Sequence, residues 1–80
     1  MRYTVSWDTS ALMELADIWN RAADQQAVTD AADQVDRDLA FSPESKGVPF
    51  YGDLLLVAAP LQVVYKVDRA KRLVTILQVW

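Results

Sequence analysis

The second half of the chain contains three short apolar runs that are separated by turn residues. The runs cover residues 54–58, 61–67 and 73–79, with Ala59-Pro60 in the first gap and residues 68–71 in the second. β-Branched and aromatic residues in short runs of this kind are typical of consecutive antiparallel strands. The pattern therefore predicts a three-stranded meander. Alternation in the middle run gives that strand one markedly apolar face.

The start of the chain predicts a strand followed by a helix. Tyr3, Val5 and Trp7 alternate with polar residues, and residues 8–10 are candidate helix N-caps. Apolar residues at spacings of three and four then predict the helix. Its apolar face is expected to contain Leu12, Leu15, Ala16, Trp19, Ala22 and Ala23.

A second helix is predicted to follow at once, with Asp24 as its cap. It ends before Ser42-Pro43, because the residue before a proline is pushed out of the helical region. Its apolar stripe is expected to contain Val28, Ala31, Ala32, Val35 and Leu39. Residues 42–53 hold two prolines and two glycines, so we expect an irregular connection there in preference to a functional loop.

The order β-α-α-β-β-β predicts an α+β fold in which residues 1–80 form one domain. It is a two-layer sandwich, with a helical hairpin packed on one face of a mostly antiparallel four-stranded sheet. Five residues lie on the apolar stripes and are expected to be buried between the layers: Trp19, Val35, Leu39, Val63 and Tyr65.

The other face of the sheet is expected to be partly solvated and to carry an apolar patch. Aromatic candidates for that patch are Trp7, Phe50, Tyr51 and Trp80. The candidate partner-binding residues, which are more apolar than a surface in contact with water alone requires, are Leu54, Leu56, Val64 and Trp80. The alternative is that these residues fill a thicker core, and the pattern leaves both interpretations open.

Composition excludes several functional classes. The 80 residues contain neither cysteine nor histidine, which removes disulfides, Ser-His and Cys-His nucleophiles and typical zinc sites. The net charge of −3 weighs against general affinity for nucleic acid or anionic membranes. Residues 1–5 have no signal-like apolar segment, and the longest apolar run, 54–61, is far shorter than the roughly 20 residues of a membrane helix. We expect a soluble protein.

The remaining chemical candidates are weak. Aspartates of the second helix are interpreted as a solvated face and not as a metal site. No glycine-rich phosphate loop follows a strand, so no cofactor is expected. Tyr65 is interpreted as a core or interface residue. Basic side chains form a candidate patch for phosphate or an acidic peptide, although a solubilised turn is the favoured interpretation; they are Lys46, Lys66, Arg69, Lys71 and Arg72.

Order and spacing along nearly the whole chain resemble the RelE/ParE superfamily of bacterial toxins. The resemblance lies in residues 3–7, 15–19, Leu39 before Ser42-Pro43, 44–47, 60–67 and 74–80. It implies a small cytoplasmic toxin of a type II toxin–antitoxin system, of the kind associated with plasmid stabilization. Its partner would be an antitoxin peptide that lies across the sheet and helices. Members of the superfamily either cleave messenger RNA on the ribosome without a metal or inhibit DNA gyrase.

The resemblance also gives a reason to doubt RNA cleavage. It places Asp53 and Leu55 near the positions of two strand lysines of the nuclease branch, and Gln62 where a strand arginine is usual. Asp53 would repel a phosphate. No catalytic residue is therefore assigned, and a ParE-like or non-catalytic role by protein binding is expected. The alternative is a non-toxic, homo-oligomeric interaction domain that retains the fold.

Overall fold

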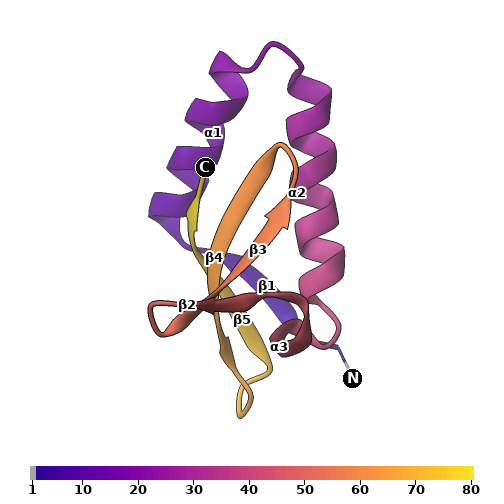
Figure 1. Ribbon diagram of the computed structural model, residues 1–80, viewed down its shortest axis with the longest axis vertical. Coiled ribbons are helices and arrows are strands. Elements are labelled where there is room, and N and C mark those ends of the chain that lie inside the picture. Colours follow the sequence, from indigo (N-terminus) through magenta and orange to yellow (C-terminus); the bar gives the residue numbers. More distant parts are fainter. Residues whose placement is uncertain (1) are drawn as a thin grey trace.

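The computed structural model describes residues 2–80 and contains the predicted elements together with two more (Figure 1). The elements in chain order are β1 (Thr4–Trp7), α1 (Thr9–Arg21), α2 (Gln25–Leu39), α3 (Pro43–Lys46), β2 (Val48–Phe50), β3 (Asp53–Ala58), β4 (Leu61–Asp68) and β5 (Leu73–Val79). Asp24 caps α2 as predicted, since its side chain accepts a hydrogen bond from the Ala27 amide at 3.1 Å. Asp8 holds the N-cap position of α1.

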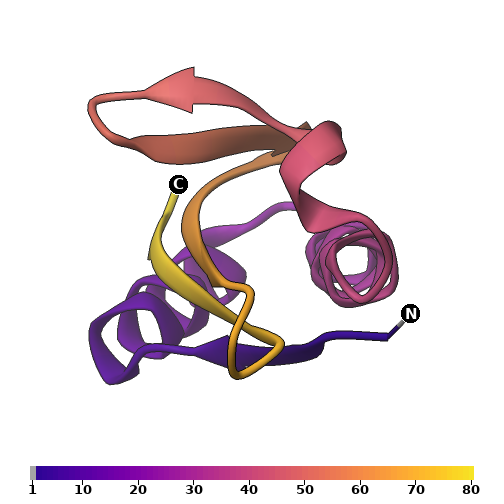
Figure 2. The same cartoon turned by 90° about the horizontal axis from the view of Figure 1, so that it is seen from below.

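The strands form one sheet in the order β1-β5-β4-β3-β2. Strand β1 pairs with β5 in parallel, and every other pairing is antiparallel. Figure 2 shows the sheet curling from β1 to the β2–β3 hairpin, with α2 along the inside of the curve. The predicted α+β architecture of a helical hairpin on a mostly antiparallel sheet is confirmed, with five strands in place of four.

The extra strand lies in the segment that was expected to be irregular, and that expectation is wrong. Pro43 begins α3, where a missing amide hydrogen costs nothing because the first turn of a helix has no partner for it. Pro49 lies in β2, an outer strand, where one edge needs no amide donors. The same prolines that argued against regular structure therefore occupy positions where regular structure tolerates them.

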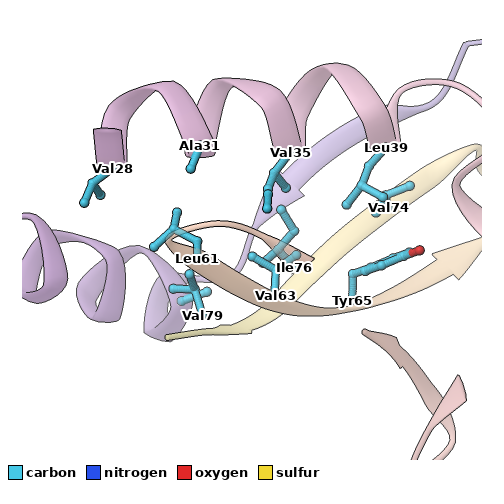
Figure 3. Packing of buried hydrophobic residues seen from close by; sticks show 12 residues of the cluster. Val28, Ala31, Val35, Leu39, Leu61, Val63, Tyr65, Val74, Ile76 and Val79 are labelled. Carbon is cyan, nitrogen blue, oxygen red and sulfur yellow. The ribbon is translucent and has the colours of Figure 1, made fainter. Parts of the chain in front are cut away.

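The core lies between α2 and the inner face of the sheet (Figure 3). Residues of α2 that follow the predicted stripe point at apolar residues of β4 and β5. Fully buried members include Val35, Leu39, Val63 and Tyr65, as expected from their stripes. Their spacing of four in α2 and of two in β4 reflects the repeats of helix and strand.

The predicted facing of α1 is wrong in part. The helix buries Ala11 and packs Leu15 and Ile18 against the core, whereas Trp19 is 40% exposed. Trp19 lies on the flank of α1, where its indole Nε1 donates to Thr29 Oγ1 of α2 at 3.2 Å. A stripe that starts at Ala11 has the same spacing as one that starts at Leu12, so periodicity does not distinguish them. The prediction chose the stripe with the bulkier side chains.

Tyr65 connects the centre of the sheet to the segment that leads into β2. It is fully buried, and its hydroxyl donates to the Pro43 carbonyl oxygen at 2.6 Å. Gly47 lies close against the same hydroxyl, because a Cβ atom there would be 2.5 Å from the Tyr65 hydroxyl oxygen and 2.8 Å from the Leu55 carbonyl oxygen. Only glycine fits this close approach, which fixes where β2 begins.

Replacement of Leu39 by alanine should lower the free energy of unfolding by about 2–5 kcal/mol, because it opens a cavity in the centre of the core. Chemical denaturation measures this loss. Met13→Ala, at an α1 position that is 69% exposed, is the control and should change stability by less than about 0.5 kcal/mol. Equal effects of the two substitutions would contradict the packing of α2.

Tyr65→Phe should destabilise the protein by about 1–2 kcal/mol at pH 7, because the Pro43 carbonyl loses its donor. Burial also raises the pKa of Tyr65 above its ordinary value of 10.0. The unfolded chain therefore ionises first, so this contribution to stability is fully present below about pH 10 and is lost as the pH rises through the folded-state pKa. The difference between wild type and variant should narrow in alkaline denaturation series, and a constant difference would contradict the account.

Candidate functional site

The face of the sheet that points away from α2 carries the candidate site. Residues directly opposite on antiparallel neighbouring strands point to the same side. Leu55 lies opposite both Val48 and Val64, and two backbone hydrogen bonds of 2.7 and 2.9 Å pair Gln62 with Trp80. We call this side the open face. Its apolar residues are Val48, Phe50, Leu55, Val57, Val64, Leu77 and Trp80.

The four predicted partner-binding residues do not share this face. Leu54 lies opposite Tyr65 and Leu56 opposite Val63, so both side chains point to the helix side and pack against the core. The expected facing of these two leucines is therefore wrong, because β3 carries apolar residues on both faces and shows no alternation. Of the other two, Val64 is only 4% exposed and Trp80 is 45% exposed.

The expected aromatic patch is present in part. Trp7 lies opposite Ile76 on the helix side, where its Nε1 donates to an Asp36 carboxylate oxygen at 2.8 Å. Phe50 forms an edge-to-face pair with Tyr51 at a centroid distance of 4.8 Å and lies 6.4 Å from the ring of Trp80. The C-terminal end of β5 thus lies beneath the β2–β3 hairpin, as Figure 2 shows.

A hollow of about 260 Å³ opens between the hairpin and β4 and β5. Its lining combines aromatic and aliphatic side chains with one carboxylate and one amide; the residues are Phe50, Tyr51, Asp53, Val64, Leu77 and Gln78. Among residues 2–80, no side chain forms a hydrogen bond or an ion pair with Asp53. Sequence reasoning missed this hollow, because Asp53 and Gln78 are brought together only by the pairing of the strands.

The hairpin owes its position to a two-residue turn. Tyr51 and Gly52 both have positive φ angles, 48° and 87°, and Phe50 and Asp53 form the closing pair. Such turns match the twist of an antiparallel pair, and glycine at the second position is a recognised signal. Tyr51 is 94% exposed at the first position, where asparagine or aspartate is usual. The sequence Phe-Tyr-Gly-Asp could have revealed the hairpin through its glycine alone.

The edges of the sheet are poor templates for another strand. Strand β2 has three residues, one of them a proline without an amide hydrogen. Strand β1 has four residues, and the Ala40 carbonyl at the end of α2 accepts the Tyr3 amide at 2.7 Å. Short, covered or proline-containing edges are how proteins prevent strand addition. The open face is therefore better suited to a partner than either edge.

The predicted basic patch is assembled only in part. Lys66, Arg69 and Lys71 line one hollow at the β4–β5 turn, which neither Lys46 nor Arg72 lines. Asp68 lies in the same hollow and accepts a hydrogen bond from the Lys71 amide. Arg69 is paired with Glu44 of α3 at 2.6 Å. The two carboxylates offset much of the positive charge, which agrees with the interpretation of a solubilised turn.

Two larger hollows, each of about 480 Å³, lie elsewhere. One runs between β1 and α2 and is lined in part by Tyr3, Trp7 and Asp36. The other lies at the α1–α2 connection, with Ile18, Ala22 and Val28 in its lining. Within residues 2–80 no three carboxylates gather closely enough to hold a metal ion, and no helix is long and apolar enough to cross a membrane.

The arrangement of a helical hairpin on this curved sheet is found in a solved structure. A chain of the toxin–antitoxin complex RelBE2 from Mycobacterium tuberculosis superposes with a TM-score of 0.83 and 21% sequence identity, covering 100% of this chain and 91% of that one. The two chains therefore share one fold. This confirms the fold expected from the resemblance. A scan against protein-family models and a search of curated proteins find no match.

Proposed function

We propose that this protein is the toxin-like component of a type II toxin–antitoxin pair and that it acts by binding another protein through its open face. It would work in the cytoplasm, with an antitoxin encoded by a neighbouring gene as its partner. The observation that carries the proposal is the RelE-type toxin fold combined with an apolar open face. The solved relative is itself a complex of toxin and antitoxin, which supports a protein partner here.

The chemistry of the open face supports binding over RNA cleavage. The resemblance to the superfamily puts Asp53 and Leu55 near two strand lysines of the nuclease branch and Gln62 where a strand arginine is usual. Strand pairing puts all three residues on the open face. A site that orients a phosphate needs cationic donors aimed at it. The carboxylate of Asp53, the aliphatic side chain of Leu55 and the neutral amide of Gln62 supply no cationic donor. Lys66 is also on the open face, but its single cation does not replace the two lysines and the arginine of the nuclease branch.

Exposed apolar area supports the same conclusion. Val48, Val57 and Trp80 are all exposed on the open face. Exposed apolar patches mark interaction surfaces in proteins. A second copy of this chain could cover the patch when the antitoxin is absent, so homodimerisation is the second candidate. In that case the protein would be a non-toxic interaction domain that retains the fold.

The purified chain should not cleave messenger RNA, either free or bound to ribosomes, above the background rate. The reason is the absence of a cationic cluster at Asp53, Leu55 and Gln62. Primer extension on translated message measures cleavage directly. Codon-specific cuts that disappear in Lys46→Ala or Arg72→Ala would overturn this prediction.

Inducible expression in bacteria should arrest growth, and coexpression of the neighbouring gene should restore it. Trp80→Ser, which removes an exposed apolar side chain from the open face, should weaken both the arrest and the binding of the neighbour's product. Met13→Ser, exposed on α1, is the control and should leave both unchanged. Unimpaired growth, together with failure to bind the neighbour's product, would contradict the proposal. A stable dimer under sedimentation would then favour the non-toxic alternative.

A further inference from the structure

We propose that the hollow between Phe50, Tyr51, Asp53 and Gln78 receives an arginine side chain of the partner protein. The inference rests on the proposed function, because it takes the occupant from a protein that docks on the open face. It adds the chemistry of the contact: a guanidinium that pairs with Asp53 and lies against aromatic rings. Below, this hollow is called the hairpin pocket.

The shape of the hairpin pocket suits one side chain. Its volume of about 260 Å³ is smaller than the roughly 300–1,000 Å³ of sites for small molecules. Val64 and Leu77 provide an apolar lining, which can pack against the methylene groups of a long side chain. Strand pairing fixes the position of Val64 in this lining, because Val64 lies opposite both Leu55 and Gln78.

The polar groups of the pocket select a cation. Asp53 is half-buried and accepts no side-chain hydrogen bond within residues 2–80. Lys66 is also on the open face, yet its ammonium group forms no ion pair with Asp53. Gln78 contributes an amide oxygen that can accept a further donor. The chain is acidic as a whole, with a net charge of −3, so a basic segment is attracted and a nucleic acid is repelled.

The aromatic walls favour a guanidinium over an ammonium. Phe50 and Tyr51 are held edge-to-face at 4.8 Å, which leaves ring surface available at the rim of the pocket. A planar guanidinium stacks on such rings and offers a fork of donors to a carboxylate, whereas an ammonium is more strongly hydrated. Tyr51 is 94% exposed at the first position of the turn, so its ring is free to contact a partner side chain.

Titration of the isolated chain with ethylguanidinium tests the pocket without any partner. Nuclear magnetic resonance should detect saturable shifts at Asp53, Leu77 and Gln78. Ethylurea, which has a similar shape and no charge, should produce none. Asp53→Asn should abolish the shifts, and Asp53→Glu, which keeps the charge, should retain them. Asp33→Asn on the exposed side of α2 is the matched control and should behave as the wild type.

The product of the neighbouring gene provides the second arm. Its dissociation constant should rise about tenfold or more with Asp53→Asn, the effect of losing a charge-assisted hydrogen bond, and stay unchanged with Asp33→Asn. Equal ethylguanidinium shifts in wild type and Asp53→Asn, or equal affinities of both for the partner, would overturn the inference. A partner that binds neither protein would contradict the proposed function instead, and the ethylguanidinium arm would still decide the nature of the pocket.

Discussion

The hydrogen bond from Tyr65 to the Pro43 carbonyl is the contact on which the shape of the open face depends. The tyrosine sits in the central strand β4 with its ring in the core, and its hydroxyl reaches the segment between α2 and β2. Gly47 allows that segment to approach the Tyr65 hydroxyl and the Leu55 carbonyl closely, because it has no side chain. The β2–β3 hairpin is thereby anchored at its base, and its tip is held over the end of β5, where the hairpin pocket forms.

Much of this fold could be predicted from the sequence, because helix and strand repeats are local. The stripe of α2 identified Val28, Ala31, Val35 and Leu39, and the alternation of β4 identified Leu61, Val63 and Tyr65, all of which are buried. The alternation did not identify Val64, which is also buried. Prediction was wrong where two patterns fit equally well. Strand β3 is apolar on both faces, so Leu54 and Leu56 could be assigned to either side, and only the register with β4 decides. The same ambiguity between neighbouring stripes led to the misplacement of Trp19.

The candidate site was harder to predict, because it is built from contacts between distant residues. The sequence showed aromatic residues available for an exposed patch, among them Phe50, Tyr51 and Trp80. Nothing in the local sequence indicates that Asp53 and Gln78 line one hollow with Phe50 and Tyr51. The hairpin that brings them together lies in a stretch whose prolines and glycines argued for irregular structure. Glycine at a positive φ, and proline at an edge, are compatible with a strand that periodicity alone would not detect.

The fold suggests a toxin, whereas the composition of the open face favours protein binding over RNA cleavage. The proposed function accounts for both. The chain shares its fold with a chain of the RelBE2 toxin–antitoxin complex, and its open face is apolar and carries the carboxylate of Asp53. One fold can carry different functions, because function depends on the residues of the site and not on the fold alone. A face of this composition, between edges that resist strand addition, is suited to a folded or helical protein segment with basic residues.

The most direct test of this account is amide hydrogen exchange of the chain with and without the product of its neighbouring gene. Binding to the open face predicts slower exchange in β3, in the first half of β4 and at the end of β5, with α1 unchanged. Protection confined to the hollow at the α1–α2 connection, with the β2–β3 hairpin exchanging as in the free chain, would contradict it.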